Sequence, residues 1–531
     1  MSDRATVSAL SGRLRHTWRP FFGRFGGLTP VQIAATPPIL DGKNVVVMAP
    51  TASGKTEAVV APVAERHMQE RWDGLAVLYI VPTRALANDT LKRVAGPLED
   101  MGLRAVLKHG DHSHLPTRLD WLITTPESLD SLICRHPDIF AQLRAVLLDE
   151  IHLLDGTYRG DQLRVLLTRL RELTAHDFAV HLISATLPNA DAVAQRYIPS
   201  AYELVSASGG RAVDLQIVTS HEEINQLARQ RGWKKILYFC NKREAVETVA
   251  SELATIWKPY PVVAHHGALT KRMREEAEQV LNESARAVGV ATSTLEVGID
   301  IGDIDLVVLA ELPWSVAALM QRVGRGCRRS GRIQCAALIT TPHDHIVIEA
   351  MFAAVAEGRL EVSPYTPDLS VGVQQALSIV FQHRGPGASD THIKQMLARL
   401  MPPEITEAIL MHLQERGWLD HRGSRWYSTK TLIDEAERGD IHANIPDTKS
   451  HRVIDVETSN DIGQIAGIFD DVFLLNGQAW QVIDMSPTTV RVRRFRGKAN
   501  AAIFKRHIQA GRYFRLLPMA LKALMRTSDN S

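Results

Sequence analysis

The sequence predicts an α/β protein with two tandem doubly wound parallel sheets, followed by a winged-helix domain and a small β-barrel. Apolar strands alternate with helical stretches from about residue 45 to 185 and again from about residue 236 to 340, the pattern of parallel sheets covered by helices. After about residue 361 the helices become short, and beyond residue 445 short strands are separated by turn residues. At 531 residues the chain is long enough for three or four domains.

A candidate phosphate-binding loop follows the first predicted strand, residues 45–48. The loop reads Ala49-Pro50-Thr51-Ala52-Ser53-Gly54-Lys55-Thr56. A strand that ends in a tight loop and opens a helix directs backbone N–H groups and the helix dipole at one place. In this pattern Lys55 reaches the β- and γ-phosphates and Thr56 holds Mg²⁺, so the loop predicts an ATP site. Ala49 replaces the first glycine of the general pattern, and a chance Gly-Lys-Thr loop is the alternative.

A second apolar strand, residues 146–148, ends in Asp149-Glu150-Ile151-His152. Side chains splay at the carboxyl end of a strand. We therefore expect Asp149 to face the hydrated Mg²⁺ while Glu150 orients and deprotonates the attacking water. A solvated acidic turn is the alternative, but a position about 100 residues after a phosphate loop favours the catalytic pair.

These two motifs resemble those of superfamily 2 helicases of the DExH type, and further segments follow in the family's order. The segments are Leu28-Thr29-Pro30-Val31-Gln32, Pro82-Thr83-Arg84-Ala85-Leu86-Ala87, Thr124-Thr125-Pro126-Glu127-Ser128, Ser184-Ala185-Thr186, Tyr238-Phe239-Cys240-Asn241, His265-His266-Gly267, residues 291–302, and residues 321–329. The resemblance implies that the two sheets are the RecA-like domains of a helicase motor.

The sequence is more closely similar to the Lhr (large helicase-related) group. Residues 292–302 resemble its version of motif V, and residues 451–458 and 472–482 resemble the β-rich domain that closes the Lhr core. The resemblance extends from about residue 20 to 515. Because the long carboxyl-terminal extension of full-length Lhr proteins is missing, we expect an Lhr core by itself.

The resemblance also implies roles around the nucleotide. Gln32 would read the adenine edge, and Gly298 and Asp300 would contact the nucleotide side of motif V. Gln321 would act through His152, and Arg325 and Arg328 would be arginine fingers on the γ-phosphate. A basic helix on DNA is the alternative for the two arginines. Cys327 departs from the small residue usual at its position.

A translocating motor also needs contacts to the sugar-phosphate backbone, which do not depend on the base sequence of the strand. Residues at the family's sugar-phosphate contact positions are Thr83, Arg84, Thr125 and Pro126 in the first RecA-like domain, and Asn241, Thr292 and Thr294 in the second. The alternative for the threonines and the asparagine is helix capping.

The carboxyl-terminal third offers two further candidate nucleic-acid surfaces. Helices at 391–400 and 404–416 followed by a wing at 417–427 predict a winged helix, in which Trp418 and Trp426 either stack on a base or fill the core. Residues 491–515 carry seven Arg and two Lys without Asp or Glu. This stripe predicts backbone contacts from Arg491, Arg493 and Arg496; a solvated barrel face is the alternative.

These patterns place domain boundaries at residues 1–208, 209–358, 359–443 and 444–531, with a hinge near residues 206–210. The formal charge of +2 requires local basic surfaces for nucleic-acid binding. The four cysteines lack paired C-x₂-C spacing, which argues against a zinc or iron–sulfur site and for reduced thiols in the cytoplasm. No signal peptide and no apolar run of about 18 residues is apparent, so we expect no membrane partner.

The sequence thus predicts an ATP- and Mg²⁺-dependent translocase and helicase, moving 3′ to 5′ on single-stranded or tailed duplex DNA as the Lhr resemblance implies. Remodelling of RNA or RNA–DNA hybrids is one alternative, because backbone grips scarcely distinguish the sugars. A nucleotide-switched binding module inside a repair or defence complex, with protein partners, is another.

Overall fold

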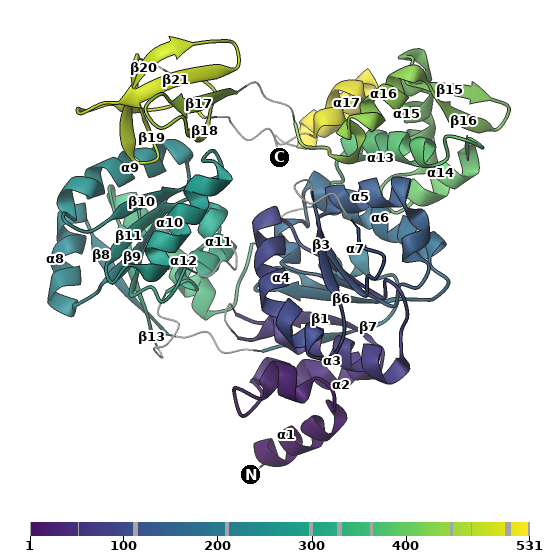
Figure 1. Ribbon diagram of the computed structural model, residues 1–531, viewed down its shortest axis with the longest axis horizontal. Coiled ribbons are helices and arrows are strands. Elements are labelled where there is room, and N and C mark those ends of the chain that lie inside the picture. Colours follow the sequence, from purple (N-terminus) through teal and green to yellow (C-terminus); the bar gives the residue numbers. More distant parts are fainter. Residues whose placement is uncertain are drawn as a thin grey trace. The chain divides into compact units, whose positions relative to one another are not determined.

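The computed structural model describes residues 2–50, 53–109, 115–207, 212–296, 301–326, 332–361, 365–446, 450–468, 470–504 and 511–528 (Figure 1). It divides into two compact units, each made of separate stretches of chain. Unit 1 comprises Met1–Ser208, Val362–Asp447 and Ile508–Ser531, and unit 2 comprises Gly209–Glu361 and Thr448–His507. The chain therefore alternates between the units.

Unit 1 is built on a seven-stranded sheet of order β3-β4-β2-β5-β6-β1-β7 in which every pairing is parallel. Strands β2, β4 and β5 are buried along their whole length, as expected for apolar strands with helices on both faces. The strands are β1 Asn44–Met48, β2 Val77–Ile80, β3 Ala105–Lys108, β4 Trp121–Thr124, β5 Ala145–Leu148, β6 Ala179–Ser184 and β7 Tyr202–Ser206. The helices are α1 Ser2–Arg13, α2 Pro30–Leu40, α3 Lys55–Glu70, α4 Arg84–Glu99, α5 Pro126–Arg135, α6 Tyr158–Leu173 and α7 Ala190–Tyr197.

A winged-helix fold completes unit 1. Its central helix, α13, packs against α5 and α6 and is buried along nearly its whole length (Figure 1). The wing is β15 and β16, joined by the short β14 in an antiparallel sheet. The elements are α13 Leu369–Gln382, β14 Ala388–Ser389, α14 Asp390–Leu397, α15 Pro403–Glu415, β15 Leu419–Arg422, β16 Arg425–Ser428, α16 Lys430–Glu437 and α17 Met519–Ser528.

Trp418 and Trp426 belong to the hydrophobic core of this winged helix, with 8% and 2% of their surfaces exposed. The Trp426 ring stacks on His421, and its Nε1 donates to Asp390 Oδ1 at 3.3 Å. This burial favours the core alternative for both tryptophans over stacking on a base.

A buried carboxylate, Asp130 on α5, lies where the winged helix meets the first sheet's helices. Asp130 Oδ1 accepts from Arg169 Nη1 at 2.6 Å and Ser378 Oγ at 2.8 Å, and His442 Nδ1 lies 3.0 Å from Asp130 Oδ2. Gln374 and Gln375 of α13 also donate to it, at 3.1 and 3.2 Å. These partners come from three stretches of chain, so the cluster ties the winged helix to α5 and α6.

Charge interactions stabilise this cluster. Burial would raise the pKa of Asp130, but Arg169, His442 and Ser378 outweigh burial and hold it below its usual value. Burial opposes protonation of His442, yet hydrogen bonds to Asp130 and Cys134 raise its pKa to about 9. His442 is thus a cation at neutral pH.

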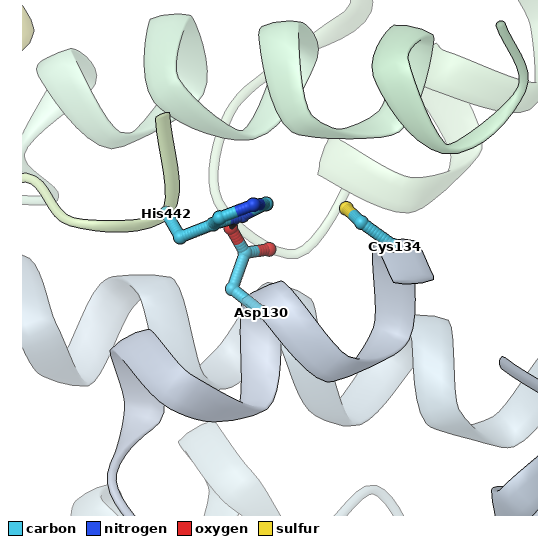
Figure 2. A group of neighbouring side chains, drawn as sticks. All are labelled: Asp130, Cys134 and His442. Atoms are coloured by element: carbon cyan, nitrogen blue, oxygen red, sulfur yellow. Dashed lines mark hydrogen bonds and ion pairs between the residues drawn. The ribbon is translucent and has the colours of Figure 1, made fainter. Parts of the chain in front are cut away.

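The same cluster has metal-ligand types at close range. Ligand atoms of Asp130, Cys134 and His442 lie within 4.8 Å of one another (Figure 2). However, Arg169 Nη1 lies 2.6 Å from Asp130 Oδ1, and Arg169 Nη2 lies 3.4 Å from Cys134 Sγ. Because a permanent cation already contacts two of the three groups, we interpret the cluster as an ion-pair network.

Unit 2 is built on a six-stranded sheet of order β10-β11-β9-β12-β13-β8, again with every pairing parallel. The strands are β8 Ala212–Val218, β9 Lys235–Phe239, β10 Val262–His265, β11 Ala287–Ala291, β12 Leu306–Leu309 and β13 Arg332–Leu338. The helices are α8 His221–Arg231, α9 Arg243–Ile256, α10 Lys271–Glu283, α11 Val316–Val323 and α12 Pro342–Ala356.

A second, mixed six-stranded sheet packs on α9 within unit 2 (Figure 1). Glu247 on α9 anchors it: the carboxylate accepts from the N–H groups of Asn476 and Gly477 at 2.7 and 2.5 Å, and His266 Nε2 lies 2.7 Å away. Both His266 and Glu247 are fully buried. The strands are β17 His451–Asp455, β18 Asp461–Ile465, β19 Val472–Leu475, β20 Gln478–Met485, β21 Thr489–Arg494 and β22 Asn500–Ala501, in the order β18-β17-β21-β20-β19-β22.

The predicted fold class is therefore confirmed, with one correction to the domain boundaries. The sequence placed residues 444–531 in a single β-barrel domain. Instead, residues 511–528 pack in unit 1, where Tyr513, Leu516, Leu517 and Leu521 join the core around α13. Across the described residues no helix combines the length and apolar character that crossing a membrane requires.

Replacing Asp130 by Asn should strongly destabilise unit 1. The substitution keeps the side chain's shape but leaves the buried Arg169 guanidinium without a counter-charge, which costs about 3–5 kcal/mol. Native-state hydrogen exchange at the amides of α5 and α13 measures this loss directly. Asp41→Asn, at an exposed ion pair with Arg13, is the matched control and should change stability by less than about 1 kcal/mol. Equal protection of α13 in both variants would contradict the account.

Raising the pH should weaken unit 1 through His442. Its pKa in the folded protein, about 9, lies above its ordinary value, so its stabilising contribution is complete below about pH 6.5 and is lost as the pH rises through 9. We expect the urea midpoint to fall between pH 7 and pH 9.5 in the parent protein and much less in His442→Gln. The same pH dependence in both proteins would show that another group is responsible.

Candidate nucleotide and nucleic-acid sites

The described part of the loop between β1 and α3 is fastened to the start of α2. Gly54 adopts φ +84°, a backbone conformation that strains any residue with a side chain, and a Cβ there would lie 2.4 Å from Gln32 Nε2. Gln32 Nε2 donates to Gly54 O at 3.3 Å, and Gln32 Oε1 accepts from Thr29 N at 2.8 Å. Gln32, expected to read the adenine edge, thus ties the start of α2 to this loop with both ends of its amide.

Lys55, the first residue of α3, carries a buried ammonium. Its side chain is 8% exposed, and among the described residues its Nζ makes no hydrogen bond; Glu150 Oε2 lies 3.9 Å away. The buried hydroxyl of Ser53 also makes no hydrogen bond to any residue that the structure describes. A desolvated ammonium requires anionic partners, so these donors fit a polyphosphate.

Asp149 lies at the carboxyl end of β5 and is oriented by a residue that the sequence did not single out. Tyr79 Oη on the neighbouring strand β2 donates to Asp149 Oδ2 at 2.6 Å, and Glu150 N donates to Asp149 Oδ1 at 2.9 Å. Burial, together with the Glu150 charge, raises the pKa of Asp149 to about 6. At neutral pH the residue is mainly a carboxylate, as a Mg²⁺ ligand must be.

Glu150 has a left-handed backbone, with φ +44°. For a residue other than glycine this conformation costs about 1–3 kcal/mol and is concentrated at functional sites. The two neighbouring carboxylates have different partners, Tyr79 for Asp149 and Lys55 for Glu150. His152 Nδ1 lies 3.4 Å from Glu150 Oε2 and 2.9 Å from Ser184 Oγ, and burial lowers its pKa, so its imidazole is neutral.

Thr56, the second expected Mg²⁺ ligand, is 8% exposed and accepts from Arg93 Nη1 at 3.0 Å. Arg93 lies on α4, far along the chain, and no spacing in the sequence marks it as part of this site.

The loop begins with Ala49 and Pro50. Ala49, 2% exposed, donates its N–H to Ser184 O at 3.2 Å, and Pro50 O accepts from Ser53 N at 3.4 Å. Five predicted site residues lie outside the described residues: Thr51, Ala52, Gly298, Asp300 and Arg328.

Two helix N-termini meet the carboxyl edge of the first sheet. Thr83 and Arg84 are exposed at the start of α4, and Thr125 and Pro126 begin α5; β2 and β4, which precede these helices, are neighbours. Thr83 Oγ1 caps α4 by accepting from Leu86 N at 3.2 Å, as the capping alternative predicts. Arg159 joins the two segments by donating to Pro82 O at 2.5 Å and to both oxygens of Glu127.

In unit 2, residues from three of the motifs that resemble the helicase family are joined by hydrogen bonds. Arg322 of α11 donates to Glu296 Oε1 at 2.7 Å and to Asn241 Oδ1 at 2.8 Å, while Asn241 Nδ2 donates to Leu312 O at 2.7 Å. The Asn241 amide, expected to hold a strand, thus has protein partners at both ends. Arg325, 2% exposed, donates twice to Glu296 O, at 3.1 and 2.7 Å. Gln321 lies on α11.

The two threonines after β11 form a hydroxyl pair. Thr292 Oγ1 lies 3.5 Å from Thr294 Oγ1, and Thr294 Oγ1 donates to His265 O at 3.1 Å. His265 Nδ1 lies 2.8 Å from the same Thr294 hydroxyl. β11 therefore ends beside β10 with hydroxyl groups at the carboxyl edge of the sheet.

The basic stripe predicted at 491–515 is divided between the two units. Arg491, Arg493 and Arg496 are exposed on and after β21 in unit 2, where Arg493 also donates to Gln481 Oε1. Arg512 instead pairs with Asp440 of unit 1 at 3.1 Å, and residues 505–510 are outside the described part of the chain. The described parts of the stripe therefore belong to two different units, and the β21 arginines stay candidates.

Comparison with known proteins gives two family matches. Residues 29–193 match the DEAD/DEAH box helicase family, and residues 219–330 match the helicase conserved C-terminal domain. The chain is 30% identical over 405 residues to the ATP-dependent helicase Lhr-Core of Sulfolobus acidocaldarius, covering 68% of this chain and 46% of that protein. The chain spans about half the length of the curated relatives it matches.

Solved structures agree with this family. The helicase Lhr of Mycobacterium smegmatis, bound to ssDNA and AMP-PNP, superposes with a TM-score of 0.68 at 25% identity, over 81% of this chain and 62% of that one. The DNA-bound helicase MrfA shares the fold with a TM-score of 0.73 at 22% identity, over 91% of this chain and 69% of that one. This chain therefore belongs to the superfamily 2 helicases of the Lhr group, with a DEAD/DEAH-box domain followed by a helicase C-terminal domain.

Proposed function

We propose that this protein is a Mg²⁺-dependent ATPase that uses hydrolysis to translocate on and unwind nucleic acid. The observation that carries the proposal is the buried ammonium of Lys55, which makes no hydrogen bond within the described part of the chain and lies 3.9 Å from the Glu150 carboxylate. A desolvated cation beside two buried carboxylates fits a triphosphate and its metal better than it fits a structural ion pair.

Each side chain has a distinct part in the proposed reaction. Lys55 neutralises the β- and γ-phosphates, and Glu150 accepts the proton of the attacking water. Thr56 and Asp149 would hold Mg²⁺, which supplies charge neutralisation at the phosphates when bound. Tyr79 keeps Asp149 turned toward this position. A neutral His152, next to Ser184, links the carboxylates to the loop after β6.

The remaining nucleotide contacts are proposed from the family resemblance. Arg328 provides positive charge to the γ-phosphate in the transition state. Arg325 is assigned a positioning role, because the Glu296 carbonyl already engages its guanidinium. Gln321, Gly298 and Asp300 keep their proposed places on the nucleotide side of motifs V and VI, and Gln32 keeps its place beside the adenine.

We infer single-stranded DNA as the strand and 3′ to 5′ as the direction. The support is the Lhr resemblance and the relative solved with ssDNA and AMP-PNP. The candidate grips are hydroxyls, helix N-termini and arginines, which bind phosphates of either sugar. RNA and RNA–DNA hybrid are therefore the comparison substrates of the test.

Glu150→Gln and Lys55→Ala should separate chemistry from binding. Glu150→Gln keeps the shape of the site but removes the base, so ATP should still bind while DNA-stimulated hydrolysis falls by about 10²-fold or more. Lys55→Ala should weaken ATP binding itself. Both variants should lose displacement of a 3′-tailed duplex, which the parent protein should displace better than a 5′-tailed one.

Glu99→Gln, an exposed carboxylate at the end of α4, is the matched control and should hydrolyse ATP normally. Near-normal ATPase in Glu150→Gln would remove that residue from the reaction. Stronger stimulation by RNA than by DNA would reassign the strand, and hydrolysis without any displacement would reduce the protein to a nucleotide-switched binder.

Replacing Arg491, Arg493 and Arg496 by Ala tests the proposed contact of the β21 surface with the strand. If these arginines bind phosphates, the slope of log affinity against log salt should fall by up to about one unit per lost contact. Because the residues of the ATP site are unchanged, hydrolysis at saturating DNA should persist. An unchanged slope in the folded triple variant would leave the three arginines as solvated residues of a barrel face.

A further inference from the structure

Trp314, in the loop that follows β12, is a large aromatic side chain with 75% of its surface exposed. Exposure of this extent is unusual for tryptophan, which normally buries most of its apolar area. The neighbouring residues of the loop, Glu311 to Pro313, are partly or fully buried. The indole therefore projects from an otherwise packed loop.

The position of this loop in the sheet is informative. β12 pairs with β9, and β9 pairs with β11, all parallel, so the three strands present their carboxyl ends at one edge. Asn241, Lys242 and Arg243 follow β9 at this edge, and the hydroxyls of Thr292 and Thr294 follow β11. Hydroxyl groups and cationic side chains, the types of group that can bind phosphates, thus lie along the edge that carries the indole.

The loop is also held in place from both sides. Asn241 donates its backbone N–H to Glu311 Oε2 at 2.5 Å and its side-chain Nδ2 to Leu312 O at 2.7 Å. On the other side of Trp314, the Glu361 carboxylate accepts from Val316 N at 3.1 and 3.3 Å, and Ser315 Oγ caps α11 by accepting from Ala318 N. A loop whose backbone is already held loses little backbone entropy when its side chain binds a partner.

We propose that Trp314 stacks on a base of the bound single strand, and that Asn241 is the positioning residue for its loop; this inference rests on the proposed function. An indole accepts the π-face of any base, so stacking is tolerant of sequence, as translocation requires. Asn241 acts through the backbone of the Trp314 loop, since its amide is engaged by Arg322 and Leu312.

The test compares binding of two strands to the purified protein. One is a dT oligonucleotide, and the other is an abasic oligonucleotide with the same number of phosphates. Trp314→Ala should weaken dT binding about ten-fold or more, and Trp314→Phe should restore most of it, because both losses and gains come from stacking. Affinity for the abasic strand should be the same in all three proteins. Leu204→Ala, an apolar residue 45% exposed on β7, is the control and should bind both strands normally.

Unchanged dT affinity in Trp314→Ala, or equal weakening on both strands, would overturn the inference while leaving the proposed function intact. A parent protein that binds neither strand and shows no DNA-stimulated hydrolysis would overturn both. A second measurement needs no variant: irradiation of the parent protein with a bromouracil-substituted strand should crosslink the peptide that contains Trp314. Crosslinks at other peptides only would also overturn the inference.

Discussion

The account depends on one constraint, that the strands of each large sheet run parallel. Parallel strands deliver all their carboxyl ends to the same edge, so loops far apart in sequence meet there. Lys55 follows β1 and Asp149 follows β5, and both reach the same edge although β6 separates the two strands. In unit 2, Asn241, Thr294 and Trp314 are collected in the same way. The candidate functional residues of each unit therefore lie along the carboxyl edge of its sheet.

At these edges, residues of different motifs form hydrogen bonds with one another. Gln32 fastens the phosphate loop, Ser184 contacts His152, and Arg322 connects Glu296 with Asn241. Under the proposed function, such links would transmit a change at the nucleotide to several loops together. The left-handed backbone of Glu150 indicates that the surrounding packing is strong enough to keep a strained turn.

Local patterns in the sequence predicted what depends on local chemistry. The apolar strands, the phosphate loop and the carboxylates after β5 could be located because each is marked by adjacent residues. Partners that meet only through the fold could not be predicted. No pattern in the sequence indicates that Tyr79 contacts Asp149 or that Arg93 contacts Thr56. Asp130 and His442, which also contact each other, are 312 residues apart in the sequence. The run of basic residues at 491–515 is continuous in sequence, so composition alone could not reveal that the part with Arg512 belongs to a different unit from the part with Arg491.

A motor must couple the state of its nucleotide to its grip on the strand, and this coupling tests the central claim most directly. The affinity for a single-stranded dT oligonucleotide should be measured with AMP-PNP and Mg²⁺, with ADP and Mg²⁺, and with neither. The account predicts that the two nucleotides change the affinity by different factors, about ten-fold apart or more, because only a differential interaction can drive a cycle. Equal affinity in all three conditions would contradict it.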